Sequence, residues 1–250
     1  MPVPLFHIPR LDPVQAHIVH SAFEMAAFFL GGWLWRRSRK GHSLLLDRSP
    51  DFPALVGCLL GAVTGSKLAN WIQDPGPLIV HGMLRIPGQS MVGGLLGAWL
   101  GVELAKRLFG MRESTGDGFV QPMLWGLCVG RIGCFLAGLN EDTFGLPTNL
   151  PWGVDLGDGI SRHPAPLYEI LFAATLALVL RRWPTNAPIG LRFRICAAAY
   201  MAWRIGVEFL KPRPWDFMGF SGLQWICLAG LAWAATEIVI TMKRPRHAAA

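Results

Sequence analysis

The sequence predicts an all-α membrane protein with seven transmembrane helices, and its composition and charge pattern carry this prediction. Hydrophobic residues make up 52% of the 250 residues and charged residues only 16%, whereas soluble domains carry about a quarter charged residues. The Lys and Arg residues form short clusters between long apolar runs, which is typical of multi-pass membrane proteins. Despite the net charge of +7, the pattern argues against a nucleic-acid-binding domain, a soluble enzyme and a disordered chain.

Seven apolar segments have roughly the 20 residues that are needed to cross the hydrocarbon core of a bilayer. Glycine or an ionisable residue interrupts several of them, so we expect helices that pack against one another. We treat residues 1–250 as a single integral membrane domain, with the first helix as an uncleaved insertion signal. The segments lie near residues 17–35, 53–72, 90–109, 118–138, 165–182, 191–210 and 220–241.

The distribution of basic residues predicts the orientation of these helices. Of the 23 Lys and Arg residues, 15 fall in connections on one side, five on the other, and three inside the segments. The positive-inside rule then places the N-terminus outside and the C-terminus in the cytoplasm. The longest outer connection, at about 139–164, is rich in Gly and Pro and is expected to be an ordered, turn-rich loop.

The five cysteines lie inside apolar runs and show no metal-binding spacing. Buried free thiols are therefore expected, and no metal or cofactor is predicted.

Acidic residues inside the segments are costly in lipid, so each one needs a partner or a function. Glu103 and Glu237 lie near basic cytoplasmic ends, where pairing with a neighbouring lysine favours a structural role. Glu24, in the first segment, has no obvious local partner and stays ambiguous. In the second segment, Gly61 and Gly65 form a small-xxx-small pattern that is typical of close helix contacts.

Tyr200, Arg204 and Glu208 recur every four residues, which puts them along one stripe of the sixth helix. One interpretation is an Arg–Glu pair within the helix that neutralises itself in lipid. The other is a functional site, because a guanidinium without a purpose at mid-span would cost a few kcal/mol. Both interpretations stay open at this point.

Arg131 is the second arginine inside the predicted membrane region, in the stretch GLCVGRIGCFLAG. Its neighbours Gly130 and Gly133 are expected to leave a pocket beside it instead of a packed contact. Two intramembrane arginines with few mid-membrane acids suggest an anionic ligand, and a phosphate suits the guanidinium fork.

Further polar residues gather where the fifth segment begins, in RHPAPLYE. This stretch contributes Arg162, His163, Tyr168 and Glu169 to a candidate substrate site. The two tyrosines of the chain, Tyr168 and Tyr200, both lie beside charged clusters.

These motifs resemble those of the prolipoprotein diacylglyceryl transferase family. The resemblance rests on their order and spacing and extends from about residue 55 to 235. It is carried by GRIGCFLAG (130–138), FGLPTNLPWGV (144–154), RHPAPLYE (162–169) and the Tyr200–Arg204–Glu208 stripe followed by GLQ (222–224).

The resemblance implies an enzyme of the bacterial cytoplasmic (inner) membrane that uses phosphatidylglycerol. Such an enzyme moves the diacylglyceryl group to the lipobox cysteine of a prolipoprotein, forms a thioether and releases glycerol phosphate. The implied partners are phosphatidylglycerol, a prolipoprotein lipobox peptide and the lipid bilayer, with no nucleic acid.

The resemblance also implies roles for individual residues. Arg131 and Arg204 would bind the phosphate and stabilise the departing glycerol phosphate, while Tyr200 and Glu208 orient Arg204. The residues expected at the substrate are Gly130, Gly133, Glu141, Gly145, Arg162, His163, Tyr168 and Glu169.

Two departures from the family pattern concern the chemistry. Val92 stands where the family has the histidine of an HGG motif, which is linked to activation of the thiol, and Cys134 replaces the signature asparagine. The signature is also two residues longer, so that Glu141 or Asp142 takes the place of the family's glutamate. A thiol with a pKa of about 8.5 still has to lose its proton. His81, Glu141 and His163 are the alternatives for this role.

Two other functions stay open. One keeps the phospholipid donor but uses a different acceptor, consistent with the missing histidine. The other is a non-catalytic lipid-binding or transport protein, which is disfavoured because transporters often contain internal repeats and none is found in this sequence.

Overall fold

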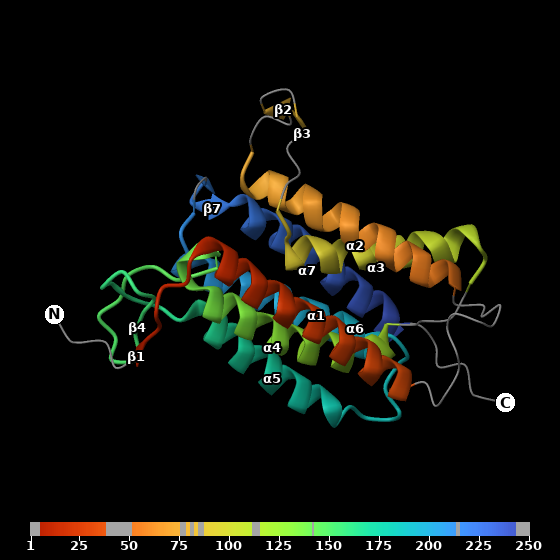
Figure 1. Ribbon diagram of the computed structural model, residues 1–250. Helices are drawn as coiled ribbons and strands as arrows, with labels where there is room; N and C mark the ends of the chain where they lie inside the picture. The colour runs from red at the N-terminus through yellow and green to blue at the C-terminus, as the bar shows by residue number, and fades with distance from the viewer. Residues whose placement is uncertain are drawn as a thin grey trace. The chain divides into compact units, whose positions relative to one another are not determined.

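The computed structural model is mostly helical (Figure 1), and it describes residues 6–38, 52–75, 79–80, 83–84, 88–111, 116–141, 143–213 and 216–243. Each predicted segment forms a helix, with ends that shift by a few residues. His81 and Asp142 lie outside the described residues. The helices are α1 (Pro13–Ser38), α2 (Phe52–Gln73), α3 (Met91–Leu108), α4 (Val120–Ala137), α5 (Ala165–Arg181), α6 (Leu191–Val207) and α7 (Gly222–Lys243).

Four helical segments of the described chain are long and apolar enough to cross a membrane, namely α1, α2, residues 117–140 around α4, and α7. The other three helices do not meet both requirements, one because of its charged residues and two because of their length. α3 carries Glu103, Lys106 and Arg107 within its 18 residues, and α5 and α6 have 17 residues each. Glu103 is paired with Lys106 at 2.9 Å, as the sequence predicted.

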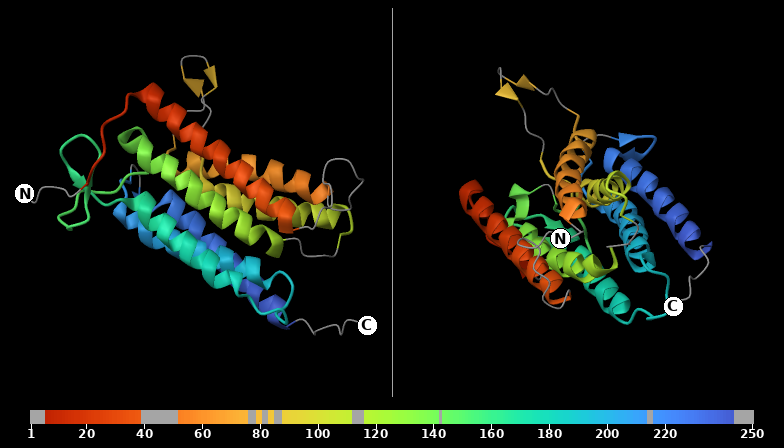
Figure 2. Two further views of the ribbon diagram at one scale, coloured as in Figure 1. Left: turned by 60° about the horizontal axis from the view of Figure 1, so that its bottom comes forward. Right: turned by 90° about the vertical axis from the view of Figure 1, so that its right-hand side faces the viewer.

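The chain divides into two units, and each is described by itself. The first unit holds residues 1–41, 115–196 and 206–212, and the second holds residues 42–114, 197–205 and 213–250. In the first unit α4 packs against both α1 and α5, which Figure 2 shows from two further directions. α1 and α4 run antiparallel, because Gly31 meets the Pro122 carbonyl and Gly126 meets that of Ala27.

In the second unit, α2 and α3 meet along a row of glycines. The backbone of α2 at Gly57, Gly61 and Gly65 faces that of α3 at Gly101, Gly97 and Gly93, so closely that a Cβ atom would overlap the opposite chain. The predicted small-xxx-small contact at Gly61 and Gly65 is therefore confirmed, and its partner is α3. Small residues let helix backbones approach in this way, which strengthens packing in lipid.

The predicted ordered loop at about 139–164 contains strands β4 (Val154–Asp155) and β5 (Ser161–Arg162). Both belong to a three-stranded sheet with β1 (Phe6–His7), which pairs in parallel with β4. The sequence did not predict this pairing, which attaches the start of the chain to the loop. Further two-residue strands form two antiparallel pairs, β2 (Ile79–Val80) with β3 (Met83–Leu84), and β6 (Asp216–Phe217) with β7 (Phe220–Ser221).

Candidate active site

A small pocket in the first unit lies where α4 ends and α5 begins. Its walls come from three of the motif stretches, which are separated by up to about 30 residues along the chain. These stretches are GRIGCFLAG, FGLPTNLPWGV and RHPAPLYE. The lining residues are Cys134, Phe135, Gly138, Phe144, Val154, Leu156, Arg162, His163, Pro164 and Pro166. Because the lining is mainly apolar with two basic side chains, the pocket suits a molecule that combines apolar and anionic parts.

Backbone hydrogen bonds fix the motifs around this pocket. His163 N donates to Leu146 O at 3.0 Å, and Leu146 N donates to Leu210 O at 2.8 Å. Gly145 lies directly against the backbone of His163, where any Cβ atom would overlap the His163 carbonyl oxygen. A glycine is thus required at the position that the resemblance marks as the end of the signature.

Beside the pocket, Arg131 of α4 is paired with Glu169 of α5. Arg131 Nε lies 2.8 Å from Oε2 of Glu169, and Nη2 donates to Oε1 at 3.1 Å. Glu169 is fully buried, and Lys211 Nζ lies 4.0 Å from its Oε2. Two cations and one carboxylate therefore lie together in a mostly buried cluster. The sequence singled out Arg131 and Glu169 separately, but it did not link them and it missed Lys211.

The expectation of open space beside Arg131 is wrong at its two glycine neighbours. Gly133 packs tightly against Phe23 of α1, and Gly130 faces Ala27 of the same helix. Both glycines therefore serve the contact between α1 and α4. The pocket opens instead next to Cys134, whose Sγ accepts a hydrogen bond from Arg131 Nη1 at 3.5 Å.

The polar side chains of RHPAPLYE contact the 139–164 loop and one another. Arg162 Nη1 donates to Asp158 Oδ1 at 2.7 Å, and the guanidinium lies over the ring of Phe144. Tyr168 accepts a hydrogen bond from Trp152 Nε1 at 2.8 Å, and its hydroxyl lies 3.3 Å from His163 Nδ1. The structure thus places Arg162 and His163 in the wall of the pocket, with Tyr168 next to His163.

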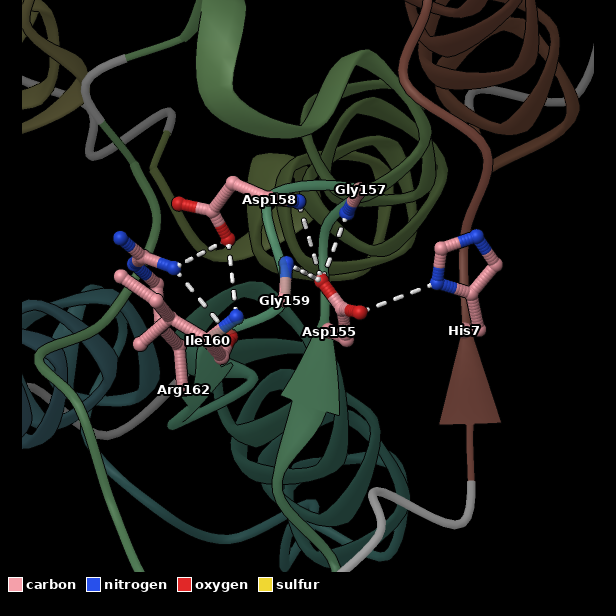
Figure 3. A network of polar contacts seen from close by, with 7 residues as sticks. All are labelled: His7, Asp155, Gly157, Asp158, Gly159, Ile160 and Arg162. Carbon is pink, nitrogen blue, oxygen red and sulfur yellow. Dashed lines mark hydrogen bonds and ion pairs between the residues drawn. The ribbon is translucent and has the colours of Figure 1, made fainter.

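Asp155 organises the loop that carries Arg162 (Figure 3). Its Oδ1 accepts hydrogen bonds from the backbone N–H groups of Gly157, Asp158 and Gly159 at 2.8 to 3.1 Å, and its Oδ2 lies 3.1 Å from His7 Nδ1. Burial acts to raise the pKa of Asp155, but the hydrogen bonds from Gly157 and His7, with those from Gly159 and Asp158, hold this pKa below its ordinary value.

Glu141 and Glu24, two acids from the sequence analysis, meet at one histidine of α1. His20 Nδ1 lies 2.9 Å from Glu141 Oε1, and His20 Nε2 lies 3.2 Å from Glu24 Oε1. The partner that Glu24 lacked in the sequence is therefore His20, four residues earlier on the same helix face. This i, i+4 spacing was the sequence signal that could have revealed the pair.

In the second unit, Tyr200 and Arg204 are buried on α6. α6 ends at Val207, and Glu208 begins the 3-10 helix η3 (Glu208–Leu210), so the predicted stripe does not continue to Glu208 as α-helix. The GLQ motif has a structural role near Arg204. Gln224 Nε2 donates to the carbonyl of Ile205 at 2.9 Å, a group close to the end of α6.

Gln224 also begins α7 together with Ser221. Ser221 N donates to Gln224 Oε1 at 2.8 Å, and Gln224 N donates to Ser221 Oγ at 3.2 Å. These reciprocal bonds form a capping box. One fully buried glutamine thus starts α7 and holds the end of α6.

The position of Val92 on α3 is also buried, with 1% of the residue exposed. An isopropyl group cannot accept a proton, so this site does not replace the family's histidine chemically. Among the residues that the structure describes, no group of three or more His, Cys, Asp or Glu side chains is placed to hold a metal ion.

Fold and site together define a multi-pass helical membrane protein with a pocket and a buried charge cluster at one end of α4 and α5. The family model of prolipoprotein diacylglyceryl transferase matches residues 10–240, and the chain belongs to this family of transferases.

Relatives from several bacteria cover most of the chain. A phosphatidylglycerol–prolipoprotein diacylglyceryl transferase of Nitratidesulfovibrio vulgaris (strain Miyazaki F) is 32% identical over 249 residues, which cover 88% of each chain. Proteins of the same name from Cupriavidus metallidurans and Bordetella avium are 29% and 28% identical, and the alignments cover 97% and 94% of each chain.

Proposed function

We propose that this protein transfers the diacylglyceryl group of phosphatidylglycerol to the lipobox cysteine of a prolipoprotein. In this reaction the cysteine sulfur forms a bond to the terminal glyceryl carbon. The bond between that carbon and the phosphate oxygen breaks, and glycerol phosphate departs with the electron pair. The observation that carries the proposal is that the three motif segments line one pocket beside the Arg131–Glu169–Lys211 cluster.

The two cations of the cluster fit the proposed leaving group. Negative charge grows on the phosphate as the bond breaks, and a positioned guanidinium stabilises it best where water is excluded. Arg131 carries this role, with Glu169 fixing the direction of its fork and Lys211 adding the second positive charge. Arg204, oriented by Tyr200 and Glu208, is proposed as the second phosphate-stabilising arginine on grounds of the resemblance.

The remaining site residues are proposed to form the substrate surroundings. Arg162, His163 and Tyr168 bind at the loop side of the pocket, and Gly145 keeps the loop close to His163. Gly130 and Gly133 act indirectly, by letting α1 pack against the face of α4 next to Arg131.

We further propose a single domain of seven membrane-spanning helices in the bacterial cytoplasmic membrane, with the N-terminus outside. Two observations support α3 as a crossing in addition to the four long apolar segments. Since β1 pairs with β4, both strands lie on one side of the membrane, so an even number of helices must cross between them. α1, α2 and α4 are three long apolar helices in this interval, and α3 supplies the fourth crossing by running antiparallel along α2 at the glycine row.

A different acceptor with the same phospholipid donor is the second candidate function. Val92 and Cys134 favour it, because both replace residue types that the family resemblance links to the standard reaction. The two functions share the donor half of the reaction and differ in which nucleophile attacks it.

The test incubates the purified protein, in vesicles of phosphatidylglycerol, with a lipobox peptide. Mass spectrometry then follows the peptide, and a phosphate assay follows glycerol phosphate. The expected result is a diacylglyceryl adduct on the peptide cysteine, absent from a Cys→Ser peptide and from vesicles of phosphatidylethanolamine alone. Arg131→Lys and Arg204→Ala should each lower the rate at least about 100-fold, as expected for loss of a charge-stabilising donor.

Arg181→Ala is the matched control, because Arg181 is exposed in the last turn of α5, away from the pocket. Glycerol phosphate release without modification of the peptide would favour the different acceptor. Binding of phosphatidylglycerol with neither product would contradict both reactions and support a non-catalytic lipid-binding protein.

A further inference from the structure

His20 lies between two carboxylates, each of which contacts a different nitrogen of its ring. Glu141 Oε1 is 2.9 Å from Nδ1, and Glu24 Oε1 is 3.2 Å from Nε2. The imidazole is mostly buried, with 15% of the side chain exposed, whereas Glu141 is 30% exposed. Because the two contacts involve different nitrogens of the ring, the three side chains lie in a row, which we call the Glu141–His20–Glu24 row, and do not converge on one point.

The Glu141–His20–Glu24 row lies at the same end of α4 as the pocket. Glu141 follows η2 (Gly138–Asn140), within three residues of two pocket-lining residues, Gly138 and Phe144. A Cβ atom at Gly133, the residue before Cys134, would be in van der Waals contact with the carbonyl of His20. Of the three residues, Glu141 is the one that follows the pocket-lining segment of the chain directly.

The proposed reaction needs a group that takes the proton from the acceptor thiol, and Val92 supplies none. We infer that Glu141 and His20 together accept this proton, with Glu24 as the residue that positions His20. This inference rests on the proposed transferase function. It differs from the earlier alternatives because it couples Glu141 to a histidine that the sequence analysis did not consider.

The proton transfer is balanced as follows. The thiol S–H gives its proton to the carboxylate of Glu141, and this proton moves on to Nδ1 of His20, 2.9 Å away, while Glu24 Oε1 lies 3.2 Å from Nε2 of the same ring. The thiolate attacks the glyceryl carbon, and the C–O bond to the phosphate breaks. The proton then leaves the imidazolium through the partly exposed Glu141 to water. An imidazolium flanked by two carboxylates is stabilised in the way that a catalytic aspartate stabilises a protonated histidine.

The charged groups that face His20 in the described part of the chain support this proton uptake. From its own helix α1 it faces Glu24, and from the segment after η2 it faces Glu141. The nearest cation of α4, Arg131, is bound to Glu169 of α5. The charged side chains that contact the ring are thus both carboxylates.

The test compares His20→Gln, Glu141→Gln and Glu24→Gln with His17→Gln as the matched control. His17 is exposed on the same helix, one turn earlier. Initial rates of thioether formation are measured from pH 6.5 to 9.5 with phosphatidylglycerol vesicles and the lipobox peptide. Thermal unfolding of each variant is recorded in the same detergent.

At pH 7, His20→Gln and Glu141→Gln should lower the rate about 100-fold or more, as expected for loss of a general base. Above the thiol pKa of about 8.5 most of the acceptor is already ionised, so the deficit should shrink at least tenfold. Glu24→Gln should show a smaller loss with the same trend. His17→Gln should match the wild type throughout.

A deficit that stays the same at every pH would overturn the inference, since a structural defect has no reason to follow ionisation of the acceptor. Equal rates for His20→Gln and His17→Gln would overturn it as well. If His20→Gln fails to fold, Glu141→Gln on the partly exposed segment decides by the same criterion. Absence of thioether from the wild-type protein would instead overturn the proposed function, and this inference with it.

Discussion

Arg131 pairs with Glu169 across the contact between α4 and α5, with Nη2 donating to Oε1 at 3.1 Å and Nε lying 2.8 Å from Oε2. Such a pair is costly to break, because the carboxylate of Glu169 is fully buried and would be left without its main counter-charge. The pair therefore has two separable effects, one on stability and one on the direction of the guanidinium.

Arg131→Ala should lower the free energy of unfolding by about 3–5 kcal/mol, as is typical when one partner of a buried pair is removed. The double variant Arg131→Met/Glu169→Leu should recover part of this stability, because no buried carboxylate is left without Arg131, and should still be inactive. Thermal unfolding in micelles and the transfer assay measure the two effects. An active double variant would show that Arg131 serves the fold alone.

Gly97→Ala should separate α2 from α3, because the new Cβ atom would overlap the Gly61 carbonyl oxygen. We expect a loss of about 1–3 kcal/mol, typical of an overpacked contact, seen as a lower melting temperature. Gly94→Ala is the matched control on the same helix, since its nearest neighbours would lie at 3.8 Å. There the better helix propensity of alanine should leave stability equal or slightly higher. A similar effect of both substitutions would contradict the role of the glycine row.

Gln224→Ala should cost more stability than Ser221→Ala. Each substitution removes one side-chain cap from the start of α7, worth about 1 kcal/mol. Only Gln224→Ala also leaves the Ile205 carbonyl without its donor, which adds about 1–3 kcal/mol. Unfolding of both variants in the same detergent measures the difference. Equal losses would show that the bond to Ile205 contributes nothing.

The ionisation of Asp155 makes the stability of the folded protein depend on pH, in a direction that can be stated. Since the folded protein holds the pKa of Asp155 below its ordinary value of about 3.9, its charge stabilises the fold fully above that value. This stabilisation is lost as the pH falls through the lowered, folded pKa. Asp155→Asn should therefore melt at a lower temperature than the wild type at pH 7, with a difference that disappears in strong acid. A difference that persists at pH 2 would assign the effect to shape and not to charge.

The helices could be predicted from the sequence because each rests on a local property, a run of apolar residues of nearly sufficient length. The end of α6 could not, although the spacing of Tyr200, Arg204 and Glu208 suggested one unbroken helix. Gln224, which lies outside this helix, donates a hydrogen bond to the Ile205 carbonyl. No local sequence pattern predicts a hydrogen bond between residues 19 positions apart.

The site residues were found individually by their chemistry, since an ionisable side chain in an apolar run stands out. Their connections were not, because pairing depends on which helices are neighbours. Arg131 and Glu169 lie 38 residues apart, and the link from His20 to Glu141 requires that α1 packs on α4. The length of α5 and α6 was also overestimated by the sequence, by one and three residues.

The sheet that joins β1 to β4 has a consequence for biosynthesis. His7 is made well before its partner Asp155, which follows 148 residues later in the chain. For that interval the first strand has no place to dock, while α1 to α4 are being inserted one after another. The strand can pair only after residues 154–155 have been made, so its docking comes late and needs the chain between the two strands to have returned to the same side of the membrane.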